Sequence, residues 1–200
     1  MKLAIADPPY LGYASMWYGD ADVDDSDTRP VDKRRRPHMG GVSGITPPRK
    51  ANTHPDAHEW DKPATHRDLV ERLCAEYDGW GIAMNPGNLT DYLTWTPQPY
   101  RIAVWVKPNA MPTNSRPIRS WEPVLVRVPD GRRRPSANRS PVRDYLVAAK
   151  PATGFAGAKP ASWTRWVLDM LGYDPAVDTV EDLFPGSGAV SAAIAQGVLL

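Results

Sequence analysis

This 200-residue sequence contains one cysteine, almost no net charge and no long hydrophobic run. The single Cys74 permits no disulfide within the chain, which is typical of a reducing compartment, and a small buried hydrophobe is its simplest interpretation. No apolar stretch is long enough to span a membrane, and the apolar residues 1–5 run too soon into Asp-Pro-Pro to form a signal peptide. The net charge of +1 does not by itself indicate a polyanionic partner. We therefore expect a cytoplasmic protein.

A set of metal ligands is also lacking. His54 and His58 lie close together in the sequence, but a proline between them argues against a shared helical face, and no cysteine lies near them. We interpret this segment as a solvated loop and expect no metal site.

Proline and tryptophan, by contrast, are abundant, with 22 and 8 residues, and 42% of the chain is apolar. This composition predicts one packed globular domain over residues 1–200, with long or numerous loops. Residues 11–62 contain acidic, basic and Gly/Pro-rich stretches without a sustained period. A long, partly mobile loop is predicted there, and such loops are usually lids, binding loops or disordered.

Short hydrophobic strands alternate with helical stretches along the rest of the chain. This alternation indicates an α/β sheet with crossover connections. Thr65 and Asp68 fit a capping pattern at the start of a helix, and Pro123 suggests that its strand is an edge strand or carries a bulge. The predicted strands cover 3–6, 80–84, 100–107, 121–128 and 179–183, and the predicted helices cover 65–77, 88–95, 162–171 and 189–196.

The first motif with chemical potential is Asp7-Pro8-Pro9-Tyr10, directly after the first strand. Proline has no N–H, so the Asp7 carboxylate and an adjacent backbone carbonyl offer two fixed acceptors, an arrangement that suits an NH2 group. The Tyr10 ring offers a planar group a surface for stacking. An exocyclic amine of a nucleobase meets both requirements, and accepting its hydrogens would neutralise the positive charge that develops on attack. A rigid turn is the alternative interpretation.

The second motif joins the last strand to the last helix and reads Asp182-Leu183-Phe184-Pro185-Gly186-Ser187-Gly188. Its glycines allow a tight turn and the close approach of a ligand, and the following helix offers free N–H groups. Asp182 could hold a cationic or amino-bearing ligand. Ser191 stands where a dinucleotide fingerprint needs a third glycine, which disfavours a nicotinamide cofactor, and the absence of Gly-Lys-Ser/Thr excludes a Walker loop. A simple strand–helix turn is again the alternative.

Together the two motifs resemble those of the S-adenosylmethionine-dependent DNA amino-methyltransferases, which make N6-methyladenine or N4-methylcytosine. The order, catalytic motif first and cofactor motif last, resembles the circularly permuted beta group, and the compact layout resembles small phage-encoded orphan enzymes. Lys159-Pro160 resembles the Lys-Pro segment of the family, beside the methionine end of the cofactor, and residues 102–108 resemble its Trp-x-Lys-Pro strand. The resemblance implies a Rossmann-like methyltransferase sheet, S-adenosylmethionine as cofactor and DNA as partner.

The resemblance also implies roles for single residues. Asp7 and the Pro8 carbonyl would accept the amine hydrogens of a flipped base, with Pro9 completing the corner and Tyr10 stacking on the base. Adenine N6 is favoured, because cytosine-N4 members more often begin the motif with Ser; cytosine N4 is an alternative. The cofactor set comprises Asp182, Phe184, Gly186, Ser187, Gly188, Lys159 and Pro160. The candidate DNA-binding arginines are Arg34, Arg35, Arg36, Arg116, Arg119, Arg132, Arg133 and Arg134.

The sequence departs from the family after the second motif. Family members continue with a strand whose terminal acid binds the cofactor ribose, whereas no acid follows Asp182 here. We expect a sheet truncated after the last helix, with weak cofactor binding or a pocket completed by residues 11–62, by a second subunit or by residues outside these 200. The target-recognition region, 109–150, is small, so a short recognised sequence is expected. A degenerate module that binds nucleic acid or protein, and a methyltransferase for protein glutamine, are further alternatives.

Overall fold

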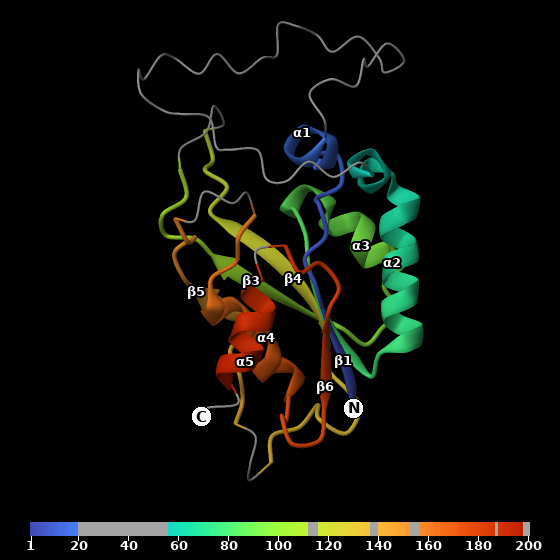
Figure 1. The fold of residues 1–200 in the computed structure, drawn as a ribbon, viewed down its shortest axis with the longest axis vertical. Coiled ribbons are helices and arrows are strands. Elements are labelled where there is room, and N and C mark those ends of the chain that lie inside the picture. The colour runs from blue at the N-terminus through green and yellow to red at the C-terminus, as the bar shows by residue number, and fades with distance from the viewer. Residues whose placement is uncertain (20–55, 112–115, 137–139, 153–156, 187, 198–200) are drawn as a thin grey trace, which may run out of the picture.

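The computed structural model describes residues 1–19, 56–111, 116–136, 140–152, 157–186 and 188–197. Six strands form one mixed sheet in the order β5-β3-β4-β2-β1-β6 (Figure 1). Strand β1 is parallel to β2 and β6, β4 is antiparallel to both β2 and β3, and β5 is parallel to β3. The strands are β1 Lys2–Ala6, β2 Gly79–Ala83, β3 Arg101–Val106, β4 Trp121–Arg127, β5 Tyr145–Val147 and β6 Thr179–Asp182.

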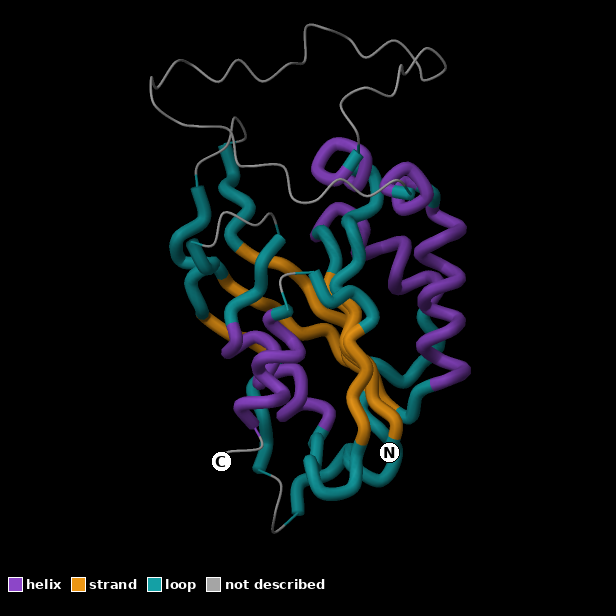
Figure 2. Tube along the Cα trace, viewed as in Figure 1, coloured by secondary structure: helices purple, strands orange, loops and turns teal. Residues whose placement is uncertain are grey.

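Helices cover both faces of the sheet, with α4 and α5 on one face and α2 and α3 on the other (Figures 1 and 2). None of the helices in the described ranges is long and apolar enough to cross a membrane. The α-helices are α1 Ala14–Tyr18, α2 Pro63–Glu76, α3 Leu89–Trp95, α4 Ala161–Leu171 and α5 Ala189–Gly197, and the short 3-10 helices are η2 Ala57–Asp61 and η3 Pro86–Asn88.

Two hydrophobic clusters hold these layers together. Successive side chains of a strand point to opposite faces, so Leu3 and Ile5 pack with Trp163 of α4, while Ala4 and Ala6 pack with Leu73 of α2. All four of these β1 residues are fully buried. Burial on both faces explains why β1 reads as a continuous apolar run rather than an alternating one.

The predicted strands and helices are confirmed in type and position, with boundaries that differ by one or two residues, but three details were wrong. Strand β4 lies between β2 and β3, and its pairing with β3 runs without interruption, so Pro123 marks neither an edge strand nor a bulge. The Pro123 carbonyl accepts a hydrogen bond from the Met84 N–H (3.3 Å), just beyond the last β2–β4 pair. The missing N–H of Pro123 therefore lies just past the end of the β2–β4 pairing, so its absence costs the sheet no ladder hydrogen bond there.

The predicted capping by Thr65 and Asp68 is also wrong. Helix α2 begins two residues earlier, at Pro63, and Lys62 occupies the N-cap position without a side-chain hydrogen bond. Proline is favoured at the first helical position because its fixed φ suits the helix and its missing N–H would have no partner there. Thr65 therefore lies inside the first turn.

The third difference concerns segments that were expected to be loops. The short helices α1 and η2 lie within the predicted loop 11–62, whereas residues 20–55 fall outside the described residues. The strand β5 was not predicted, because three half-exposed residues after an Arg/Pro/Ser-rich segment carry too little periodicity. The range 109–150 thus contains β4 and β5 as well as their connections.

Candidate active site at the carboxyl edge of the sheet

The topology of the sheet brings five charged positions to one edge. Strands β1 and β6 are parallel neighbours, so Asp7, directly after β1, lies beside Asp182 at the end of β6. Strand β3 ends, and the antiparallel β4 begins, at the same edge, which adds Lys107 and Glu122. Lys159 lies just before α4. Ligands of open α/β sheets bind at this carboxyl edge of the parallel strands.

Asp7 is engaged by an ammonium group. The Nζ of Lys159 donates hydrogen bonds to both carboxylate oxygens of Asp7, at 2.7 and 2.8 Å. It also donates to the hydroxyl of Tyr10 (3.1 Å) and to the carbonyl of Gly157 (3.3 Å). The Lys159 side chain is only 4% exposed. Asp7, whose side chain is 22% exposed, and Lys159 thus form a partly buried ion pair whose members are 152 residues apart in the chain.

A second carboxylate, that of Glu122, completes the cluster. Its oxygens accept hydrogen bonds from the Tyr10 hydroxyl and from Lys107 Nζ, each at 2.7 Å, and one of them lies 3.5 Å from Lys159 Nζ. Two carboxylates therefore face two ammonium groups, with the phenol of Tyr10 between them. Glu122 was not predicted from the sequence. Its signal was a single acidic residue near the start of an otherwise apolar predicted strand, β4, which pairs with the end of β3 just before Lys107.

Burial and these contacts set the protonation of the site. Burial raises the pKa of Asp7, the charge of Lys159 opposes the rise, and Glu122 and Asp182 add to it. For Glu122, the charges of Lys159 and Lys107 outweigh the effect of burial, and its pKa is lowered. For Lys159, the charges of Asp7 and Glu122 likewise outweigh burial, and its pKa is raised. Burial and the two carboxylates raise the pKa of Tyr10 well above its usual value, so its hydroxyl stays protonated and donates to Glu122.

An aromatic wall closes the α2/α3 side of the site. Trp60 of η2 meets Phe184 edge to face, with ring centroids 4.9 Å apart. His66 of α2 is buried, its Nε2 lies 2.7 Å from the Trp60 carbonyl, and its Nδ1 lies 2.6 Å from the Tyr92 hydroxyl. Because a carbonyl only accepts, Nε2 carries the proton and Nδ1 accepts from Tyr92. Burial lowers the pKa of His66, in agreement with a neutral ring that fixes the position of Phe184 through Trp60.

The glycine loop follows β6 beside this wall. The Leu183 N–H donates to the Ile5 carbonyl (3.0 Å), which holds the start of the loop against β1. Gly186 and Gly188 have φ angles of 36° and 74°, in the left-handed region that glycine adopts without strain. A Cβ at Gly188 would meet no atom within 4 Å, so backbone conformation rather than crowding favours glycine there. Ser187 lies outside the described residues.

Asp182 carries an unused acceptor. Its Oδ1 accepts from the Phe184 N–H (3.2 Å), whereas its buried Oδ2 has no hydrogen-bond partner within the described part of the chain. Burial raises the pKa of this carboxyl. A buried carboxylate oxygen without a donor is costly unless a ligand supplies one, so Asp182 fits a group that carries N–H donors or positive charge.

The structure gathers the residues of both sequence motifs and separates the candidate arginines. The motif residues Asp7, Tyr10, Lys159 and Asp182 meet at one edge, where Pro8 is buried, and the Lys159 ammonium lies on Asp7 and 5.4 Å from the centroid of the Tyr10 ring. Among the described residues, no three His, Cys, Asp or Glu side chains are arranged to hold a metal ion. The arginines at 34, 35 and 36, and His54, fall outside the described residues.

The two other groups of arginines lie at opposite ends of the sheet. Arg116 and Arg119 are in the β3–β4 connection at the Asp7 edge, where Arg119 donates to the Tyr13 hydroxyl (3.2 Å). The run 132–134 follows β4 at the other edge. Arg132 is 5% exposed and pairs with Asp178, whose carboxylate also binds the N-terminal ammonium (2.9 Å). Arg132 was predicted to bind DNA; in this structure its guanidinium is instead paired with Asp178 in a largely buried ion pair.

No family model matches the sequence, and no curated protein matches it. Among solved structures, the chain is similar to the crystal structure of the M1.HpyAVI-SAM complex, with a TM-score of 0.53 and 18% sequence identity. The match covers 98% of this chain and 78% of that chain. At this identity the likeness concerns the fold, and the predicted fold class is confirmed: the chain has a Rossmann-like α/β sheet similar to that of M1.HpyAVI. Asp7-Pro8-Pro9-Tyr10 directly follows its first strand, and the glycine loop follows β6.

Proposed function

We propose that the protein is an S-adenosylmethionine-dependent methyltransferase that modifies the exocyclic amine of a DNA base, at N6 of adenine. One observation carries the proposal: both carboxylate oxygens of Asp7 hold an N–H-bearing nitrogen, beside a glycine loop whose Asp182 has a free buried acceptor. The first feature fits an amine substrate, and the second fits a cofactor with amino and cationic groups. The similar fold of M1.HpyAVI, solved as a SAM complex, supports this choice of cofactor.

The cofactor set proposed for this loop is Asp182, Phe184, Gly186, Ser187 and Gly188. Asp182 Oδ2 would accept from a donor of the cofactor, and the glycines let the backbone approach it closely. Helix α5 begins directly after Gly188, and its first N–H groups have no partners within the helix. When bound, S-adenosylmethionine supplies an electrophilic methyl group. Pro160 and Lys159 complete the cofactor set on the α4 side. Because Lys159 also contacts Asp7, it would belong to both the cofactor site and the substrate-amine site.

Lys159 marks where the substrate amine would bind. Its ammonium presents N–H donors to both oxygens of Asp7 and so occupies the acceptors that an N–H of the base amine would use. A substrate amine therefore has to displace Lys159, and Glu122 lies only 3.5 Å from its Nζ. Tyr10 and Lys107 hold Glu122 in place to receive it. We infer that Lys159 moves from Asp7 toward Glu122 as the base enters, so that no charge is left buried without a partner.

Asp7 then acts by electrostatics and orientation. Its carboxylate, with the Pro8 carbonyl, accepts the two amine hydrogens and directs the nitrogen lone pair away from the acid. Positive charge would develop on that nitrogen as the N–CH3 bond forms and the S–CH3 bond of the sulfonium breaks, which releases a neutral thioether. The nearby carboxylate would stabilise the charge on the nitrogen. The nitrogen loses one proton afterwards, for which Asp7 is the nearest acceptor. Tyr10 would stack on the base once Lys159 has left the neighbourhood of its ring.

DNA contact is proposed for Arg116 and Arg119. Both are exposed and lie at the same edge as Asp7, and Arg119 bonds to Tyr13, three residues after Tyr10. Phosphate contacts there would position the duplex while the target base leaves the stack. We propose DNA contact for Arg34, Arg35 and Arg36 as well.

Transfer of a labelled methyl group tests this function. The purified protein is incubated with radiolabelled S-adenosylmethionine and duplex DNA in which adenine is either present or replaced throughout by purine, which lacks the amine. Label should enter only the adenine-containing duplex. Equal labelling of both would exclude adenine N6, and label confined to cytosine would support the N4 alternative.

A further inference from the structure

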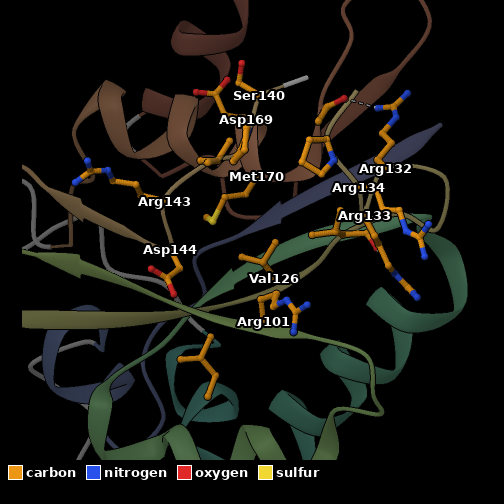
Figure 3. Close-up of a pocket in the computed structure, with 16 residues that line it drawn as sticks. Arg101, Val126, Arg132, Arg133, Arg134, Ser140, Arg143, Asp144, Asp169 and Met170 are labelled. Carbon is orange, nitrogen blue, oxygen red and sulfur yellow. Dashed lines mark hydrogen bonds between the residues drawn. The ribbon is translucent and has the colours of Figure 1, made fainter. Parts of the chain in front are cut away.

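An arginine-lined hollow of about 520 Å³ lies at the end of the sheet away from Asp7 (Figure 3). It is bounded by the start of β3, the end of β4, the segments 132–135 and 140–144, and the end of α4. Glu122 of the candidate active site and Val126 of the hollow are four residues apart on β4, which corresponds to about 14 Å along the strand. The hollow is therefore a separate place from the site around Asp7.

Acidic partners balance only part of the positive charge of the five arginines that line the hollow. Arg132 pairs with Asp178, Arg133 with the 91%-exposed Asp130, and Arg143 bonds to the neutral hydroxyl of Tyr145. Neither of the remaining two arginines has a carboxylate within 4.0 Å in the described part of the chain. These two are Arg101, at the start of β3, and Arg134, which follows β4, and both line the hollow (Figure 3). Planar guanidinium groups that lack partners suit a phosphate group.

The hollow also offers surfaces that a bare phosphate would not use. Its apolar part includes Val126, with Ile102 and Val142 left 42% and 39% exposed. Asp144 and Asp169 line it as well and can accept from hydroxyl or amino groups. Burial raises the pKa of Asp169, and the charge of Arg165 opposes the rise. Phosphate-binding arginines, an apolar surface and acceptors together match a nucleotide unit: phosphate, base and sugar.

We propose that this hollow is a second nucleotide-binding site, in which Arg101 and Arg134 hold a phosphate whose attached nucleoside contacts Ile102 and Val142. The site does not depend on methyl transfer. Its phosphate can come from a nucleic-acid strand or from a free nucleotide, and both sources share the same chemistry.

Three probes distinguish the sources: a fluorescently labelled thymidine oligonucleotide, thymidine monophosphate and inorganic phosphate. Thymine has no exocyclic amine, so these probes cannot use the amine position at Asp7. The Arg101→Gln/Arg134→Gln double variant removes the two unpaired guanidiniums. The matched control is Arg67→Gln/Arg72→Gln, which removes the same charge from the exposed surface of α2.

We expect the first double variant to bind the oligonucleotide at least tenfold more weakly than the control variant does. The salt dependence of binding should also fall by about 0.7 in log–log slope, as for one lost phosphate contact on a single strand. Loss confined to thymidine monophosphate would support a free nucleotide as the source. Equal binding of each probe by the two double variants would overturn the proposal, and inorganic phosphate binding as tightly as thymidine monophosphate would overturn the nucleoside contact. Arg134→Gln alone serves if the double variant does not fold.

Discussion

The ammonium of Lys159 lies between the two carboxylate oxygens of Asp7, 2.7 and 2.8 Å from them, although 152 residues separate the two in the sequence. Groups from four other elements face this pair: Glu122 of β4, Asp182 of β6, Tyr18 of α1 and Tyr92 of α3. The protonation of Asp7 therefore depends on partners that can be changed one at a time. This dependence makes the proposed mechanism testable through its pH profile.

Lys159→Met should move the acid limb of the methyl-transfer profile to higher pH. Burial already raises the pKa of Asp7 and Lys159 opposes the rise, so losing the ammonium raises that pKa further. A protonated Asp7 lacks the negative charge that would stabilise the positive charge developing on the amine nitrogen. Activity at neutral pH should fall at least tenfold and recover in part as the pH is raised.

The measurement is kcat/KM against pH for wild type, Lys159→Met and Lys159→Arg. The arginine variant keeps the charge and should restore much of the wild-type profile. Lys150→Met removes one exposed lysine charge and should change nothing. An unshifted acid limb in a folded Lys159→Met protein would rule out the role given to Lys159.

Glu122→Gln should shift the same limb in the opposite direction. The charge of Glu122 raises the pKa of Asp7, so its removal lowers that pKa and extends activity to lower pH. The variant also removes the carboxylate that would receive Lys159, so KM for DNA should rise. A purely structural defect would lower activity at every pH without moving the limb, and that result would contradict the exchange of Lys159 between the two acids.

Asp182→Asn should weaken cofactor binding without lowering the stability of the free protein. Asp182 Oδ2 is buried without a partner in the described residues, so removing its charge should leave the free protein equally or more stable. The same change removes the acceptor proposed for the cofactor, and calorimetry should show at least tenfold weaker binding of S-adenosylmethionine. Unchanged cofactor affinity would take Asp182 out of the cofactor set.

The Arg132–Asp178 pair should contribute to stability in a pH-dependent way. The Asp178 side chain is fully buried and is held by Arg132 and the N-terminus, so its pKa is lowered in the folded protein. Asp178→Asn should reduce the free energy of unfolding at pH 7 by about 3–5 kcal/mol, as for a broken buried ion pair.

A carboxyl with a lowered folded-state pKa stabilises the protein above its ordinary pKa. The stability difference between wild type and Asp178→Asn should therefore shrink as the pH falls below about 4. Urea unfolding at pH 7 and pH 3 measures it. The exposed Asp130 is the control, because Asp130→Asn should cost less than about 1 kcal/mol at either pH. A difference that is the same at both pH values would contradict the ion-pair explanation.

Local patterns predicted most of the sheet. Strand β1 is apolar on both faces because both faces are buried, and the two prolines after Asp7 end it at the edge where ligands bind. The glycines after β6 predicted the second half of the site. What local patterns could not predict was pairing between distant segments. Glu122 joins the site only through its register opposite Trp105, and Lys159 reaches Asp7 only because α4 packs on the sheet.

Runs of like charge were the least reliable sequence indicator of a binding site. Three consecutive arginines at 132–134 read as one basic patch, yet Arg132 is buried against Asp178 and Arg134 has no carboxylate partner among the described residues. A run of like charges does not distinguish a buried ion pair from a phosphate site, because that difference depends on a carboxylate 46 residues away.

The most direct test of the proposed function is a nucleoside analysis. Wild type, Asp7→Ala and the exposed control Asp68→Ala are expressed in a host that lacks DNA methylation, and the digested DNA is analysed by mass spectrometry. N6-methyladenine should appear with wild type and Asp68→Ala and be absent with Asp7→Ala. If folded wild-type protein leaves neither N6-methyladenine nor N4-methylcytosine in that DNA, methylation of DNA amines is contradicted.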